Sequence, residues 1–204
     1  MRRRELLTAV PATLLAGGAG CTIGGEPPEP DDLTLSSLAF DEKIPVRFTC
    51  DGAGESPPLT VRGVPERTAS LAVVGEWLRG YDPGTIWLLW DLPPEDPLEI
   101  PADRPAEERL DDPAGAAQGS NDEGELGYRS PCHQTEGDDE YRFSVFALEA
   151  ELDVDSGATR DAFDDALESL VLSSTSFTAT RARRRRRPGW LRGRCRVRPP
   201  ARTR

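Results

Sequence analysis

The chain of 204 residues contains a single histidine, His133, and only four cysteines. A zinc site needs about four Cys, His or carboxylate ligands, and no Cys-x-x-Cys pair accompanies His133. The sequence also lacks the Gly-x-Ser-x-Gly pattern that presents the nucleophilic serine in many hydrolases. We therefore predict no catalytic residue, no metal and no cofactor. A metal ligand, a general base and a Cys132–His133 nucleophile remain alternatives to an exposed loop histidine.

Lysine is as scarce as histidine, since Lys43 is the only one. Residues 181–204 hold 12 of the 25 basic residues and no acid, so residues 1–180 set 13 basic side chains against all 36 acidic ones, a net charge of −23. Such a body repels nucleic acid and anionic membrane surfaces, and we predict no nucleic-acid partner for the folded domain. The composition is typical of proteins from salt-accumulating halophiles, where molar salt screens self-repulsion. The alternative is a merely acidic protein in dilute salt.

No apolar run in the N-terminal segment is long enough to span a membrane. Residues 6–16 are apolar, but a spanning helix needs ~20 such residues. A basic start, a short apolar stretch and small residues before Cys21 instead indicate a secretory signal over residues 1–21. Arg3-Arg4-Glu5-Leu6-Leu7 resembles a twin-arginine export signal, and Ala19-Gly20-Cys21 resembles a lipobox, although Gly18 departs from it. We predict export and a lipid on Cys21 that anchors the protein to the outer face of the cytoplasmic membrane; the alternative is a cleaved signal and an ordinary cysteine.

Three further segments follow the signal. Residues 22–32 form a linker rich in Pro, Gly and acids without apolar periodicity. Residues 33–180 carry the periodic patterns of a folded domain. Residues 181–204, half of them Arg, form a tail that we predict to be disordered. The tail is either a read-through extension or an electrostatic arm for an anionic partner.

The domain is predicted to be a β-rich α+β fold. Apolar alternation or continuous apolar runs between turn signals predict strands at residues 33–35, 46–49, 59–61, 71–74, 86–90, 141–146 and 174–180. Thr159 can cap one helix, whose apolar face comprises Phe163, Ala166, Leu167, Leu170 and Val171. Many strands with a late helix predict two packed sheets with one or two peripheral helices near the C-terminus.

Residues 121–133 form a constrained loop between two predicted strands. Gly124 and Gly127 permit positive φ, Pro131 fixes the exit, and Tyr128 offers an aromatic ring with a hydroxyl. These features favour the rim of a pocket. The alternative is an ordinary long surface loop.

In this order and spacing, several motifs resemble the phosphatidylethanolamine-binding protein family, in its bacterial and archaeal Raf-kinase-inhibitor-like branch. The resemblance covers residues 33–180. The motifs are Phe48-Thr49-Cys50-Asp51-Gly52, Ser56-Pro57-Pro58-Leu59, Gly63-Val64-Pro65, Trp87-Leu88-Leu89-Trp90-Asp91-Leu92-Pro93, Gln118-Gly119-Ser120-Asn121-Asp122, Gly127-Tyr128, Pro131-Cys132, Tyr141 and Val145-Phe146-Ala147-Leu148. The resemblance implies two antiparallel sheets. It also implies a small pocket for phosphate-like anions or phospho-head groups, with no established catalytic activity.

The pocket motifs of that family are altered here. The family usually has an Asp-Pro-Asp-Ala-Pro segment, which is replaced here. Glu76 lies near the position of its first Asp, and Asp82 is interpreted as a displaced remnant of the segment. The two usual histidine positions hold Ile86 and Asp139. We predict a ligand-binding set of Glu76, Asp82, Trp87, Tyr128, Pro131 and Tyr141. In this set the tyrosines stack and hydrogen-bond, the tryptophan forms a wall, and the acids orient polar groups of the ligand.

Loss of both imidazoles removes two hydrogen-bond donors to a bound anion, and Asp139 repels one. Arg79, Arg129 and Arg142 are candidates to replace them, because guanidinium groups bind phosphate well; the alternative is that these arginines are solvated. We predict an exported, non-enzymatic binding module with weakened anion affinity, whose pocket could instead accept a neutral or cationic ligand or be a relic. A partner-binding or inhibitory module and a hydrolase using His133 are the alternatives.

Two cysteines remain if Cys21 carries lipid and Cys195 lies in the tail. An oxidising compartment favours pairing Cys50 with Cys132. Such a disulfide would join the Asp51 loop to the Tyr128 loop and stabilise the fold by up to about 4 kcal/mol. Free thiols are the alternative.

Overall fold

A computed structural model describes residues 32–132 and 138–181. The predicted signal with Cys21, His133 and the tail after Arg181 with Cys195 lie outside these residues, so the predictions made for them remain predictions. None of the helices in the described ranges has the length and apolar character that crossing a membrane requires.

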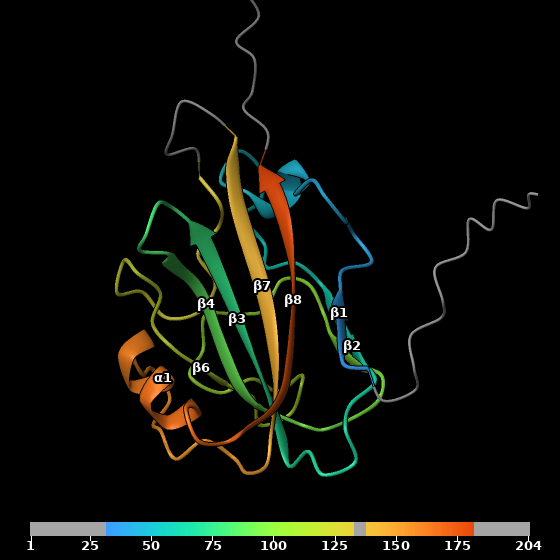
Figure 1. Cartoon of the computed structure of the whole chain (residues 1–204). Coiled ribbons are helices and arrows are strands. Elements are labelled where there is room, and N and C mark those ends of the chain that lie inside the picture. The colour runs from blue at the N-terminus through green and yellow to red at the C-terminus, as the bar shows by residue number, and fades with distance from the viewer. Residues whose placement is uncertain (1–31, 133–137, 182–204) are drawn as a thin grey trace, which may run out of the picture.

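The described residues form two antiparallel sheets (Figure 1). The larger sheet has the order β6-β4-β3-β7-β8 and comprises Ala117–Gln118, Gly84–Leu92, Ser70–Leu78, Asp139–Leu148 and Val171–Arg181. The smaller sheet has the order β1-β2-β5 and comprises Thr34–Ser36, Leu59–Arg62 and Leu98–Ile100. Every strand pair within these sheets is antiparallel. The predicted β-rich architecture of two packed antiparallel sheets is confirmed.

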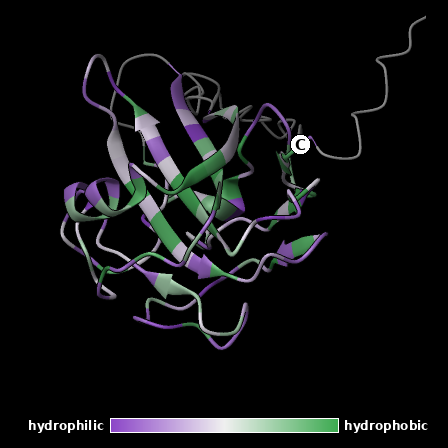
Figure 2. Cartoon of the chain, turned by 60° about the horizontal axis from the view of Figure 1, so that its bottom comes forward, coloured by the Kyte–Doolittle hydropathy of each residue, from purple (hydrophilic) through white to green (hydrophobic). Residues whose placement is uncertain are grey.

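One face of the five-stranded sheet packs against the three-stranded sheet and forms the larger core. Leu71 and Val73 on β3, together with Phe143 and Val145 on β7, contribute to it and are completely buried. Continuous apolar runs on β3 and β4 are therefore explained by burial on both faces. In Figure 2 the long strands carry hydrophobic stretches with hydrophilic ones between them.

The opposite face of the same sheet packs against the helix α1, Arg160–Leu167. The rings of Trp90 and Phe163 lie 5.8 Å apart in this second core. One helix near the C-terminus agrees with the prediction, but it is shorter than the apolar pattern suggested. Leu170 lies in a turn, where it is partly buried against the second core, and Val171 begins β8, where it is exposed.

The strand predicted at residues 46–49 is wrong. These residues form the 3-10 helix η1, Val46–Phe48. Pro45 precedes it, and Thr49 closes the turn by donating to the carbonyl oxygen of Val46 from both its amide, at 3.1 Å, and its hydroxyl, at 2.9 Å. A Thr hydroxyl bonded to a nearby carbonyl competes with strand pairing, which explains the failure of the alternation pattern here.

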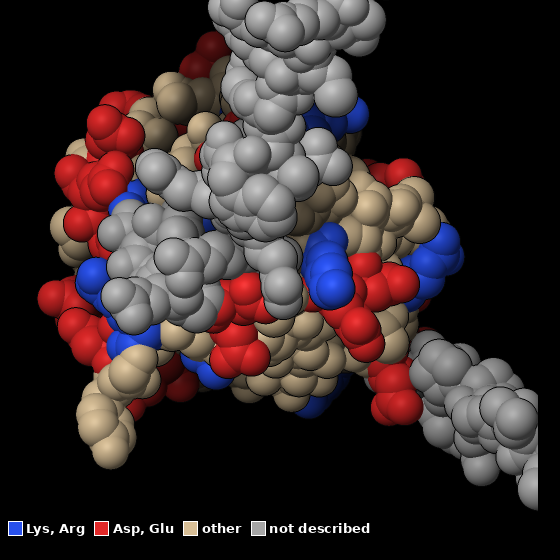
Figure 3. All heavy atoms as spheres, turned by 90° about the horizontal axis from the view of Figure 1, so that it is seen from above, with Lys and Arg blue, Asp and Glu red and all other residues tan. Residues whose placement is uncertain are grey.

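Charge is distributed over the surface as ion pairs set in an acidic background. Seen from above, the described surface shows Asp and Glu side chains spread widely, with Lys and Arg beside them (Figure 3). Arg47 with Glu55, and Arg109 with Asp91, are examples of such pairs. Exposed pairs of this kind add little stability, so the fold rests chiefly on its two apolar cores.

Candidate ligand-binding site

Tyr128 is held firmly at one end of the sheet sandwich. Its ring meets that of Trp87 edge to face, with centroids 5.5 Å apart, and its hydroxyl donates to the carbonyl oxygen of Phe48 at 3.1 Å. The loop that presents it is folded around Asn121, whose side-chain oxygen accepts from the amides of Glu123 and Glu125. Burial raises the pKa of Tyr128 above its ordinary value. Tyr128 is therefore a fixed hydroxyl that stays protonated at neutral pH.

Tyr141 lies on β7 and faces the same core. Its hydroxyl donates to the carbonyl oxygen of Cys132 at 3.2 Å. Burial raises the pKa of Tyr141, and the neighbouring carboxylate of Asp139 raises it further. Trp77 is its partner on β3, so an indole takes the place beside Tyr141 on this face of the sheet.

The disulfide between Cys50 and Cys132 is present, with the two Cα atoms 5.3 Å apart. Beside it the amide of Cys50 donates to the carbonyl oxygen of Pro131 at 3.2 Å. The bridge therefore joins the loop after η1 to the loop that carries Tyr128, as predicted. Pro131, Tyr128 and Tyr141 are brought together around this junction.

Arg181 completes this cluster, and the sequence reasoning missed it by assigning it to the tail. It is the last residue of β8 and stands opposite Asp139 in the ladder with β7. Its side chain is 5% exposed, and its Nη2 lies 2.6 Å from Asp51 Oδ2. Its Nη1 is buried and has no hydrogen-bond partner in residues 32–132 and 138–181. Residues 177, 179 and 181 alternate toward the inner face of β8, and this pattern in the sequence could have indicated that Arg181 continues the strand.

The three arginines proposed to replace the missing imidazoles already have carboxylate partners. Arg129 pairs with Asp122 at 2.9 Å and with Glu123 at 2.8 Å. Arg79 lies 3.6 Å from Asp122, and Arg142 binds Glu76. Only Arg129 is close enough to Tyr141 to lower that tyrosine's pKa, together with Arg181.

Glu76 does not share the cluster with Tyr141. In the ladder between β3 and β7, Glu76 pairs with Arg142, whereas Tyr141 pairs with the next residue, Trp77. Side chains alternate along a strand, so Glu76 faces α1 and Tyr141 faces the inner core. Arg142 and Arg160 bind the Glu76 carboxylate at 2.6 and 2.9 Å.

The other two predicted residues occupy different settings. Trp87 is fully buried, and its indole Nε1 donates to Gln118 Oε1 at 2.9 Å. Its fixed ring packs edge to face against Tyr128. Asp82 lies in the turn between β3 and β4, where its carbonyl oxygen accepts from Arg79 Nε at 3.3 Å. The structure thus brings together Tyr128, Pro131 and Tyr141 over Trp87, and sets Glu76 and Asp82 apart from them.

No group of three or more His, Cys, Asp or Glu side chains suited to a metal ion occurs in the part of the chain that the structure describes. The Tyr141 cluster, which comprises Tyr128, Pro131, Tyr141 and Arg181, offers hydrogen-bonding groups. Two protonated phenols and one partly satisfied guanidinium converge on it.

Comparison with known proteins places this geometry in a family. Residues 35–182 match the family described as phosphatidylethanolamine-binding protein. A UPF0098 protein of Pyrococcus horikoshii is 35% identical over 177 residues, which cover 83% of this chain and 85% of the relative. A UPF0098 protein of Methanothermobacter thermautotrophicus is 38% identical over 153 residues, 71% of this chain and 95% of the relative.

Two solved structures share the architecture. A putative phosphatidylethanolamine-binding protein homologue from Chlamydia trachomatis superposes with a TM-score of 0.66 at 25% identity, covering 76% of this chain and all but 1% of that one. An Escherichia coli protein described as a member of the mammalian family gives a TM-score of 0.67 at 24% identity, covering 74% of this chain and 99% of that one, and supports the fold alone. The chain therefore belongs to the phosphatidylethanolamine-binding protein family.

Proposed function

We propose that the chain is a non-enzymatic binding module that is exported and held at the outer face of the cytoplasmic membrane by a lipid on Cys21. Its ligand presents an oxygen acceptor, of the phosphate or phospho-head-group type, to the Tyr141 cluster, defined as Tyr128, Pro131, Tyr141 and Arg181. The disulfide between Cys50 and Cys132 supports an oxidising compartment. The family is one of small-ligand binders, which supports binding as the activity.

The observation that carries this proposal is the orphaned Nη1 of Arg181. A buried N–H without an acceptor is unfavourable, and a ligand oxygen would satisfy it. Arginine is also suited to phosphate because its planar fork offers two parallel donors. The phenolic oxygens of Tyr128 and Tyr141 are fixed by their own donated bonds, so each retains lone pairs for a ligand hydroxyl.

Two acids limit the affinity for a highly charged anion. Asp51 accepts from Arg181 at 2.6 Å, and Asp139 stands opposite Arg181 on β7. These carboxylates oppose the attraction that one guanidinium gives a dianion. We therefore expect a singly charged phosphodiester head group to bind better than inorganic phosphate.

The proposal is tested by calorimetric titration of the oxidised full chain with glycerophosphoglycerol, a phosphodiester without an ammonium group, and with inorganic phosphate and glycerol, in molar potassium chloride. Saturable binding of the phosphodiester that is lost in Arg181→Gln and weakened in Tyr141→Phe would support it. Arg67→Gln changes the same charge at an exposed position and is the matched control. Equal binding by the Arg181 and Arg67 variants, or no response to any phosphate, would refute the proposed site.

Export and anchoring are tested separately. In the native host, Cys21→Ser is expected to release the protein from the membrane fraction, and mass spectrometry of the parent should find a lipid on an N-terminal Cys21. An unmodified or internal Cys21 in the mature protein would reject the anchor and leave the binding site untouched.

A further inference from the structure

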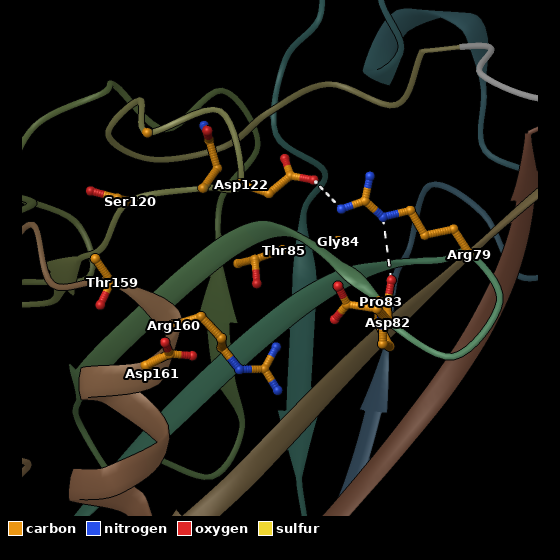
Figure 4. A pocket seen from close by; sticks show the side chains of 12 residues that line it. Arg79, Asp82, Pro83, Gly84, Thr85, Ser120, Asp122, Thr159, Arg160 and Asp161 are labelled. Carbon is orange, nitrogen blue, oxygen red and sulfur yellow. Dashed lines mark hydrogen bonds and ion pairs between the residues drawn. The ribbon is translucent and has the colours of Figure 1, made fainter.

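A hollow lies on the other side of the five-stranded sheet from the Tyr141 cluster, between the N-terminus of α1 and the turn that joins β3 to β4 (Figure 4). Its volume is about 530 Å³, which is enough for a small organic molecule. We call it the α1 groove. Its lining comprises Arg79, Asp82, Pro83, Gly84, Thr85, Ser120, Asn121, Asp122, Gly124, Thr159, Arg160 and Asp161.

Thr85 is the central feature of the α1 groove. It pairs with Glu76 across β3 and β4 and therefore projects from the face that α1 covers. The residue is only 5% exposed, yet its hydroxyl makes no hydrogen bond within residues 32–132 and 138–181. Figure 4 places it in the middle of the groove, between the α1 side and the β3–β4 turn. Its hydroxyl is not one of the fully buried unsatisfied atoms of the described residues, so it is open to the groove and can accept a hydrogen bond from a ligand.

The arginines of the α1 groove are already neutralised. Arg160 binds Glu76 at 2.9 Å, and its Nε lies 2.8 Å from each oxygen of Asp164. Burial acts to lower the pKa of Arg160, but its bonds to Asp164 and Glu76 outweigh that effect and raise it. Arg79 lies beside Asp122 at 3.6 Å. Neither guanidinium offers an uncompensated charge to an anion.

Two carboxylates of the same lining are not neutralised. Asp82 and Asp161 have no salt bridge among the residues that the structure describes, and they approach the groove from the β3–β4 turn and from the first turn of α1 (Figure 4). Asp161 also offsets the partial positive charge at the start of the helix. The unpaired charge of the groove is therefore negative.

From these observations we propose that the α1 groove binds a small organic molecule carrying a primary ammonium group. The ammonium would donate to the Thr85 hydroxyl and be attracted by the Asp82 and Asp161 carboxylates, which enter the groove from opposite sides (Figure 4). An anion would be repelled by both acids. A metal ion is disfavoured because the described residues provide no group of three suitable ligands. The site is separate from the Tyr141 cluster, since Thr85 and Glu76 face α1.

The test compares three probes of nearly equal size: n-butylammonium, 1-butanol and butanoate. Each is titrated into the oxidised, isotopically labelled full chain, and binding is followed by amide chemical shifts in the α1 groove. Salt is kept at about 0.1 M KCl, because molar salt screens a charge–charge contact. We expect saturable shifts with butylammonium and none with the neutral or anionic probe.

Variants locate the contact. Asp82→Asn and Asp161→Asn are each expected to weaken butylammonium binding several-fold, because each removes one of the negative charges that attract the ammonium. Thr85→Val keeps the shape, removes the hydroxyl and should weaken binding several-fold. Asp165→Asn, an exposed acid on the same helix outside the groove, is the matched control, and thermal melting of each variant checks its fold.

Equal affinity in the Asp161 and Asp165 variants would overturn the proposal, as would equal binding of 1-butanol or a preference for butanoate. Arg181→Gln should leave butylammonium binding intact, because Arg181 belongs to the Tyr141 cluster. Failure of the phosphodiester site and failure of the ammonium site can therefore be told apart.

Discussion

Arg181 Nη2 lies 2.6 Å from Asp51 Oδ2, and this contact joins two residues that are 130 positions apart in the chain. It closes the end of β8 against the loop that follows η1. The same loop is bonded to Cys132 through the disulfide, and the Tyr141 hydroxyl donates to the carbonyl oxygen of Cys132. One cross-link, one ion pair and one phenol thus fix the end of the sandwich where we propose ligand binding.

The first prediction concerns this ion pair. Arg181→Gln is expected to lower the free energy of unfolding by about 1–3 kcal/mol, because a charge-assisted bond of a buried guanidinium is lost. Asp51→Asn should cost at least as much, since it leaves the buried guanidinium of Arg181 without its carboxylate. Denaturant unfolding of the two single variants and the double variant gives the coupling energy, which should be roughly 1 kcal/mol. Strict additivity would mean that the pair does not couple the two segments.

A second prediction concerns the disulfide. Replacing both Cys50 and Cys132 by Ser should lower the free energy of unfolding by about 2–4 kcal/mol, since the bridge constrains a long loop in the unfolded chain. Chemical denaturation of parent and variant measures the difference. Cys195→Ser, in the tail, serves as the control for the substitution itself. If the parent lost no stability on reduction, the bridge would not contribute to the fold.

The fold was predictable from sequence because its signals are local. Continuous apolar runs at Leu71–Val74 and at Ile86–Trp90 have no other stable place than a sheet covered on both faces. The helix could be located because Phe163 and Leu167 recur at helical spacing. Residues 46–49 were misassigned because alternation over four residues cannot outweigh a turn closed by Thr49.

The site was less predictable because the register between neighbouring strands decides which side chains lie together in it. Glu76 and Trp77 are adjacent in sequence, and the ladder with β7 decides which of them lies beside Tyr141. That ladder runs without a register shift from Ser70 to Leu78, and a slip of one residue would exchange the two side chains between the faces of the sheet. Arg181 was hidden for a similar reason, since it is the first of the 12 arginines in residues 181–204 but the last residue of β8 in the structure.

The third prediction concerns Glu76, whose side chain is 5% exposed between two arginines. Glu76→Ala should cost about 3–5 kcal/mol, because two partly buried guanidinium groups lose their shared carboxylate. Glu76→Gln keeps the shape and one acceptor and should cost less. Thermal or denaturant unfolding measures both, with Glu140→Gln on the exposed side of β7 as the control. A Glu76→Ala variant as stable as the control would show that the cluster is dispensable.

The last prediction concerns the two buried phenols at alkaline pH. The pKa values of Tyr128 and Tyr141 are raised in the folded protein, chiefly by burial, whereas unfolded tyrosines ionise near about pH 10. Below about pH 10 both states hold the proton and stability does not depend on these groups. Above it the unfolded chain releases protons that the folded chain retains, so the free energy of unfolding should fall by roughly 1.4 kcal/mol per pH unit for each tyrosine.

Denaturant unfolding between about pH 9 and 11 measures this slope. Tyr128→Phe should remove about half of it, although it also loses the bond to Phe48 and lowers stability at every pH. Tyr81→Phe changes a fully exposed hydroxyl and should leave the slope as in the parent. A Tyr128→Phe variant with the parental slope would mean that this phenol ionises in the folded state. The fixed, protonated hydroxyl assigned to the Tyr141 cluster would then be wrong.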